Sequence, residues 1–196
     1  MTLLGLIAVA PAAEDLGGFV DMRLTYKTTS TRYHVEFAAV DADENWDLAH
    51  RAELNWFGSL GLRRWGGVIW GLGGAWWYNK GELPDGTDAS FQTWTVQGHL
   101  GYGLPLIADH LQLELVPYVG FGRSHLQLPD GDSGADAYWE VGGNANLVWT
   151  FTSGLQLGGT ASIWTYETSV ENEAGQHYRF KDELPVAIGV FIGARL

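Results

Sequence analysis

The chain has 196 residues and a mass of 21.5 kDa, which fits one compact domain and leaves little room for a second. Its 11 Lys and Arg residues against 23 Asp and Glu residues give a net charge of -12, which opposes attraction to phosphate backbones, so we expect no nucleic acid partner. The absence of Cys excludes disulfides and thiolate chemistry, while 27 Gly, 10 Trp, 8 Tyr and 8 Phe residues indicate an ordered, closely packed fold.

The first 13 residues have the pattern of a secretory leader. Residues 3–13 form an apolar run of the length of a signal-peptide core, and Ala10-Pro11-Ala12 matches the small-residue pattern of a cleavage site. The sequence therefore predicts a signal peptide over residues 1–13 and one domain over residues 14–196, and an ordinary apolar first strand or helix is the alternative. No apolar run reaches the ~18 residues that a membrane-spanning helix requires.

Most of the chain alternates between apolar and other side chains with a period of two, which is typical of β-strands. In the last segment, one face carries Leu184, Val186, Ile188, Val190, Ile192, Ala194 and Leu196. In the first, Val20, Met22, Leu24 and Tyr26 alternate with Asp21, Arg23, Thr25 and Lys27. Similar segments occupy residues 47–60, 66–78, 90–104, 111–126, 137–151 and 154–166, so the sequence predicts eight strands.

The connections between these segments alternate in length and charge. Residues 61–65, 105–110 and 152–153 form short turns, whereas the other connections are longer and acidic. Their acidic residues are Asp41, Asp43, Glu44, Glu82, Asp85, Asp88, Asp130, Asp132, Asp136, Glu171 and Glu173. This asymmetry is typical of outer-membrane barrels, and strands in lipid must close because lipid cannot hydrogen-bond a sheet edge. We therefore expect an all-β fold, an eight-stranded antiparallel up-and-down transmembrane β-barrel in the bacterial outer membrane.

A further alternating stretch, Tyr33, Val35, Phe37 and Ala39, lies between the first two segments. We interpret residues 33–40 as a loop hairpin that projects above the membrane, because single-chain bacterial barrels have even strand numbers. A ten-stranded barrel is the alternative.

The two faces of the barrel lead to two further predictions. The interior of an eight-stranded barrel is just wide enough to be filled by side chains. We expect a buried ion-pair network in the lumen, made of Asp21, Arg23, Lys27, Arg51, Glu53, Glu114, Glu140 and Arg195 and bridged by Asn55, Gln97, His99, Gln112, Asn144 and Asn146. Aromatic residues at segment ends predict two belts at the membrane boundaries, with Tyr26, Trp76, Trp94, Trp139 and Trp164 at the long-loop end and Trp56, Tyr102 and Trp149 at the short-turn end.

One segment carries a resemblance to a known family. Leu113-Glu114-Leu115-Val116-Pro117-Tyr118-Val119-Gly120-Phe121-Gly122 combines a polar strand, Pro-Tyr and Gly-x-Gly. With this segment and its terminal alternating strand, the chain resembles the small outer-membrane β-barrel family of the opacity-protein, OmpX and OmpA-domain type over nearly its whole length after residue 13. In that family the last residue is usually aromatic and helps the barrel-assembly machinery to recognise the strand, whereas here it is Leu196. The expected partners are therefore this machinery, outer-membrane lipid and lipopolysaccharide.

Candidates for catalysis and metal binding are few. Ser124, His125 and Glu140 are similar to the residue types of outer-membrane lipid A deacylases, but adjacent strand residues point to opposite faces unless a bulge intervenes. The six His residues are scattered, and the acidic loop over residues 130–136 lacks the distal Glu of a calcium-binding EF-hand, so we interpret it as a solvated loop. The sequence predicts no catalytic residue, no metal site and no cofactor.

The sequence favours a non-enzymatic, porin-like barrel with a filled lumen, which contributes to envelope integrity or presents acidic extracellular loops for surface interaction. The sequence does not identify the surface partner. One alternative is an outer-membrane enzyme that modifies lipid A or phospholipid. Another is a soluble periplasmic barrel of the lipocalin type, in which the apolar face points inward and binds an apolar ligand. Alternation alone cannot separate this soluble barrel from the membrane barrel, because a period of two shows only that the two faces of a strand differ.

Overall fold

The computed structural model describes residues 19–29, 32–37, 40–45, 49–62, 66–83, 86–107, 110–129, 133–171 and 177–195. The predicted signal peptide lies outside these residues. The strands are β1 (Phe19–Thr29), β2 (Arg32–Phe37), β3 (Val40–Asn45), β4 (Ala49–Leu62), β5 (Gly66–Glu82), β6 (Asp88–Ile107), β7 (Leu111–Gln127), β8 (Ser133–Thr150), β9 (Leu155–Glu171) and β10 (His177–Arg195). Among the described residues, no helix is long and apolar enough to cross a membrane.

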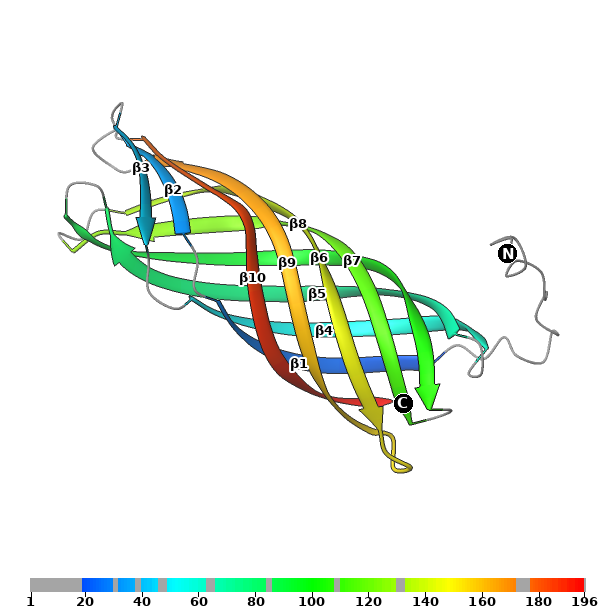
Figure 1. The fold of residues 1–196 in the computed structure, drawn as a ribbon. Coiled ribbons are helices and arrows are strands. Elements are labelled where there is room, and N and C mark those ends of the chain that lie inside the picture. The colour runs from blue at the N-terminus through cyan, green and yellow to red at the C-terminus, as the bar shows by residue number, and fades with distance from the viewer. Residues whose placement is uncertain are drawn as a thin grey trace, which may run out of the picture.

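Eight of the strands form a closed antiparallel ring in the order β1, β4, β5, β6, β7, β8, β9, β10 (Figure 1). The ring closes where β1 pairs with β10, from Asp21 opposite Arg195 to Thr28 opposite Ile188. The predicted all-β, eight-stranded antiparallel barrel is confirmed. Each strand of the ring therefore has a hydrogen-bonded neighbour on both sides over the paired residues, as in a closed barrel.

The strands β2 and β3 form a hairpin that lies outside this ring. β2 pairs with β10 over Tyr178 to Lys181, on the part of β10 that extends past its pairing with β1. Figure 1 shows the hairpin beside the upper end of β10. The alternating stretch that begins at Tyr33 is therefore a hairpin, as expected, and the structure does not show a ten-stranded barrel.

Side chains alternate between the two faces of the wall, as the period of two requires, and the alternation shifts by one residue only at irregularities such as the one between Glu183 and Val186 on β10. On β1, Met22 is 51% exposed and Leu24 is 55% exposed, whereas Arg23 and Lys27 between and beyond them are buried. On β10, Ile188 points outward and Phe191 points inward. The apolar face is thus the outer one and the polar face lines the lumen. This arrangement contradicts the lipocalin-like alternative, in which the apolar face would point inward.

Most of the strands are longer than the sequence predicted. β10 begins at His177 instead of residue 184, and β9 continues to Glu171 instead of residue 166. The outward positions in these extensions are polar, as at Ser169 and Arg179, so the apolar alternation ends although the backbone ladder continues. The predicted long loops were therefore wrong in extent, because backbone hydrogen bonds do not need apolar side chains.

The two ends of the barrel differ in their connections. The loop end carries the connections at residues 83–87, 128–132 and 172–176, together with the β2–β3 hairpin. The turn end carries the connections at residues 63–65, 108–110 and 151–154.

Candidate functional site: a cross-braced lumen

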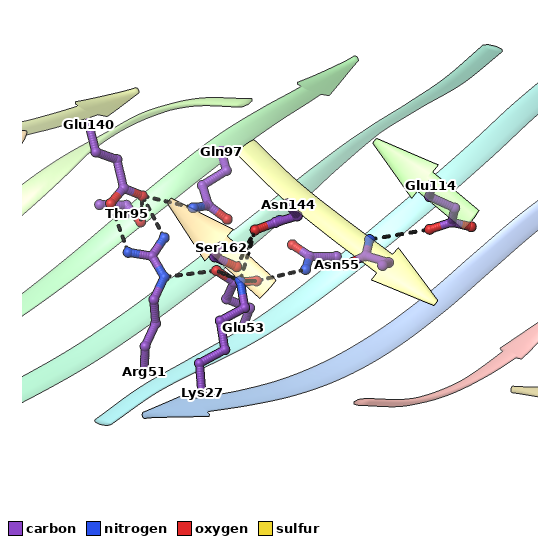
Figure 2. Close-up of polar contacts among 11 residues, drawn as sticks. Lys27, Arg51, Glu53, Asn55, Thr95, Gln97, Glu114, Glu140, Asn144 and Ser162 are labelled. Atoms are coloured by element: carbon purple, nitrogen blue, oxygen red, sulfur yellow. Dashed lines mark hydrogen bonds and ion pairs between the residues drawn. The ribbon is translucent and has the colours of Figure 1, made fainter. Parts of the chain in front are cut away.

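Four charged side chains meet in the middle of the lumen and form the central cluster, which consists of Lys27 on β1, Arg51 and Glu53 on β4, and Glu140 on β8 (Figure 2). The Lys27 Nζ atom lies 2.9 Å from both carboxylate oxygens of Glu53. The Arg51 Nε atom donates to Glu53 Oε1 at 2.8 Å. All four side chains are buried, so their charges are compensated by one another and not by water.

Arg51 also forms a bidentate pair with Glu140. Its Nη1 atom donates to Oε2 at 2.8 Å and its Nη2 atom donates to Oε1 at 2.7 Å. In the ring, β4 and β8 are four pairings apart in either direction, so this ion pair joins opposite walls of the barrel. The planar guanidinium group matches a carboxylate in this two-bond geometry, which fixes both side chains.

A second cross-lumen ion pair, the turn-end pair, joins Arg23 on β1 to Glu114 on β7. Arg23 Nη2 donates to Glu114 Oε1 at 2.8 Å, and Arg23 Nη1 donates to Oε2. β1 and β7 are again four pairings apart in the ring, so two independent bridges span the barrel. The Arg23 guanidinium group also lies over the rings of Phe57 and Phe191, 5.0 and 5.2 Å from their centroids.

Neutral polar side chains complete the hydrogen bonding around these charges. Gln97 Nε2 donates to Glu140 Oε1 at 2.7 Å, and Asn144 Oδ1 accepts from Lys27 Nζ at 3.1 Å. Around the turn-end pair, Gln112 and Asn146 donate to the two carboxylate oxygens of Glu114. These contacts offset part of the cost of moving ions out of water, which an ion pair alone often fails to repay.

Inward-facing glycines make room for this network. A Cβ atom on Gly120 would lie 2.8 Å from Cγ and Oε1 of Glu140. One on Gly73 would lie 1.9 Å from Asn55 Oδ1. In each case the glycine lies directly beside the polar residue on the adjacent strand, and its missing side chain leaves the space that the polar side chain occupies.

An aromatic cluster packs against the central cluster and extends from it toward the loop end. It consists of Trp77, Phe91, Tyr138, Trp164, Tyr166 and Phe180, all buried. Trp77 packs edge-to-face against Tyr166 at 5.1 Å, and the rings of Phe91 and Phe180 lie 4.6 Å apart. The cluster is tied to the charges below it, because Tyr138 donates a hydrogen bond of 3.0 Å to Glu140 Oε2.

This aromatic cluster was not predicted from the sequence. A signal was present, because Tyr138 has the same strand parity as Glu140 and must point to the same face. The outward or inward direction of an aromatic ring thus follows from its charged neighbours on the strand and not from its own chemistry.

The structure brings together six of the eight charged residues that the sequence placed in the lumen, in two separate groups. Asp21 lies opposite Arg195 in the β1–β10 register, and nothing is described of the Asp21 side chain. Arg195 is half-buried at the turn end, away from the central cluster. Of the predicted bridging residues, His99 is buried against the rings of Phe57 and Tyr118.

Seven of the eight aromatic residues assigned to the outer belts point outward or lie half-buried on the outer face. They are Tyr26, Trp56, Trp76, Trp94, Tyr102, Trp139 and Trp149. The belt prediction is wrong for Trp164, which is 1% exposed and points into the lumen. Its ring centroid lies 5.1 Å from the Arg51 guanidinium carbon. Its neighbour Ile163 takes the outward position, which leaves Trp164 the inner face.

The three residues considered for catalysis are not assembled. Ser124 points inward and contacts Thr168 Oγ1 at 2.6 Å, whereas its neighbour His125 is exposed on the outer face. Glu140 is engaged by Arg51 in the central cluster. Among the described residues, no group of three or more His, Asp or Glu side chains is placed to hold a metal ion, and the acidic loop at residues 130–132 lies outside the description.

Comparison with known proteins identifies the fold. No family model and no curated protein matches the chain. Among solved structures, Neisserial surface protein A has a TM-score of 0.53 at 9% identity and covers 91% of this chain and 98% of its own. The outer membrane protein OprG from Pseudomonas aeruginosa has a TM-score of 0.52 at 11% identity, covering 92% and 97%. A major outer membrane protein from Thermus thermophilus has a TM-score of 0.51 at 10% identity, covering 90% and 99%.

Proposed function

Because the chain has the fold of small outer-membrane β-barrel proteins, we propose that it is a non-enzymatic barrel of the bacterial outer membrane that acts through its exposed loop end. In this proposal the barrel supports envelope integrity or carries a surface interaction, and the lumen serves to hold the barrel rigid.

The filled lumen is the observation that carries this proposal. Two ion-pair bridges cross it, and the aromatic cluster closes it toward the loop end. A diffusing solute would have to separate at least one buried ion pair, and a buried charge without its partner is costly. Eight strands also leave little space beyond what the side chains fill. Function is therefore expected outside the lumen.

The chemistry of the loop end supports an interaction surface for cationic partners. The carboxylate residues Glu82, Asp88, Asp136 and Glu171 are exposed there. The sequence of the β2–β3 hairpin adds Asp41, Asp43 and Glu44, and the whole chain carries a net charge of -12. A surface with an excess of one charge sign raises the local concentration of oppositely charged partners and speeds their association. The exposed Lys80 and Arg179 at the same end offset part of this excess.

Fractionation and gel migration test the location. A band in the outer-membrane fraction that migrates differently before and after boiling supports the proposal, because a closed barrel resists unfolding by SDS. An unshifted band in the periplasmic fraction would overturn it.

In planar bilayers, the purified barrel should give no steady ion conductance, and a regular conductance would contradict the role given to the lumen.

A separate experiment tests the loop end. Barrel in phosphatidylcholine nanodiscs should bind poly-lysine, and binding should weaken with added salt. A variant with Glu82→Gln, Asp88→Asn, Asp136→Asn and Glu171→Gln should bind more weakly and still shift on boiling. Equal binding by both proteins would remove the acidic surface from the proposal.

Replacement of Ser124 and His125 by Ala should leave lipid A acylation unchanged in the host cell, and a changed pattern would favour the enzyme alternative.

A further inference from the structure

A groove interrupts the lipid-facing surface over strands β7 to β10. Its volume is about 430 Å³. Its floor contains Gly143, Ala145 and Ala161, and its sides include Leu115, Ile163 and Val186. The groove lies on the outer face of the wall, in the same belt of exposed apolar side chains that surrounds the barrel.

The strand register explains how the groove forms. One row of outward positions runs from Pro117 through Gly143 to Ile163, and the next runs from Leu115 through Ala145 to Ala161. The middle of each row has a side chain no larger than a methyl group. The flanking side chains project into the surroundings, since Leu115 is 52% exposed and Ile163 is 44% exposed. Small residues between large ones leave a channel in the surface.

We propose that this groove holds one acyl chain of a membrane lipid, in a longer-lived contact than the rest of the lipid-facing surface provides. The inference rests on the membrane location given under the proposed function. The groove is continuous with the apolar belt, so its occupant comes from the hydrocarbon layer. The wall of a second barrel would meet the projecting Leu115, Ile163 and Val186 side chains first and would have to insert a side chain between them to reach the floor.

A linear hydrocarbon chain fits this shape because it is narrow and flexible. On a convex surface, an acyl chain contacts protein on one side only. In the groove it contacts the floor and both sides, and the many additional atom pairs each add a small dispersion attraction. The site therefore holds a hydrocarbon chain by shape and requires no headgroup contact.

Two outward glycines give a matched pair of variants. A Cβ atom on Gly143 would have Pro117 Cα as its nearest neighbour, at 3.9 Å, so Gly143→Leu can fill the groove without entering the lumen. A Cβ atom on Gly98 would meet nothing within 4 Å. Gly98 faces outward on β6, between Leu72 and Val119 in register and away from the groove. Gly98→Leu therefore adds the same side chain to the belt but leaves the groove open.

The test counts lipids retained by the barrel. Wild type, Gly143→Leu and Gly98→Leu are reconstituted with dimyristoylphosphatidylcholine, extracted into detergent and analysed by native mass spectrometry. The one-lipid adduct of the monomer should fall by about tenfold in Gly143→Leu, as expected when on the order of ten dispersion contacts between the acyl chain and the groove are lost, and stay at the wild-type level in Gly98→Leu.

Three results would overturn the inference. Equal adducts in all three proteins would show that the groove retains no lipid. Equal loss in both variants would show a general effect of an added Leu side chain. A wild-type dimer that disappears in Gly143→Leu would show that a second copy occupies the groove. The boiling shift of each variant is recorded in parallel, so a failure of the barrel itself is distinguished from a failure of the groove.

Discussion

Arg51 on β4 and Glu140 on β8 form two hydrogen bonds, of 2.8 and 2.7 Å, across the full width of the barrel. They are 89 residues apart in the chain and belong to opposite walls. Arg23 and Glu114 repeat this relationship between β1 and β7. The lumen therefore contains ion pairs that connect opposite walls of the barrel. These pairs can form only when the ring is closed, and they stabilise the closed ring in turn.

Removal of one partner of the central bridge should destabilise the barrel strongly. Arg51→Met leaves Glu140 as a buried carboxylate without its cation, and we expect a loss of roughly 3–5 kcal/mol in the free energy of unfolding. The double variant Arg51→Met with Glu140→Met keeps the lumen neutral, because Lys27 still pairs with Glu53. It should be more stable than Arg51→Met alone. Urea unfolding in lipid vesicles measures both values.

Arg123→Met provides the control for this series. Arg123 is exposed on the outer face, so its replacement should change the free energy of unfolding little. The single variant Glu140→Met completes the cycle, and a double-variant loss equal to the sum of the two single losses would show that the two residues do not act as a pair. A double variant as unstable as Arg51→Met would show instead that the unpaired Glu140 carboxylate adds no penalty of its own.

The β2–β3 hairpin should be dispensable for closure of the barrel. Thr29 at the end of β1 lies opposite Ala49 at the start of β4, so a two-residue turn can join them directly. Replacement of residues 30–48 by Asn-Gly, which favours the type I′ turn, should give a barrel that still migrates differently before and after boiling. Loss of the shift would show that the pairing of β2 with β10 is needed for closure.

Gly120 should tolerate a methyl group poorly. The new Cβ atom of Gly120→Ala would come within 2.8 Å of the Glu140 side chain and displace it from Arg51, at a cost of roughly 1–3 kcal/mol. Gly98→Ala, on the outer face with open space around it, should be close to wild type. Thermal unfolding in detergent compares the two, and equal melting temperatures would contradict the assignment of Gly120 to a packed position.

The aromatic cluster should contribute more to stability than the outer aromatic belt. Trp77 is 1% exposed and contacts Phe91, Tyr138, Trp164 and Tyr166, so Trp77→Ala should cost roughly 3–5 kcal/mol and reduce the near-ultraviolet circular dichroism. Trp94 is 63% exposed on the outer face, and Trp94→Ala should cost clearly less. A larger loss for Trp94 would mean that lipid contacts outweigh packing in the lumen.

Much of the fold followed from the residue pattern. The alternation of Val186, Ile188 and Val190 with smaller residues predicted a strand, and repetition of that pattern predicted a ring of eight. The extent of the strands did not follow, because the apolar signal stops where the outer face becomes polar, as at Ser169, while the backbone pairing continues. Trp164 was misassigned for a related reason: its direction depends on strand parity, whereas the belt prediction used its position near a segment end.

The sequence by itself determined which faces of the strands differ, because side-chain alternation is a local consequence of strand geometry. It also showed that the candidate lumen carries both signs of charge. Only the tertiary structure decided which face is inside and which charges meet. Arg51 selects Glu140, and Arg23 selects Glu114, because the order and register of the ring place those strands opposite one another. That placement depends on pairings between residues far apart in the chain, which no local pattern records.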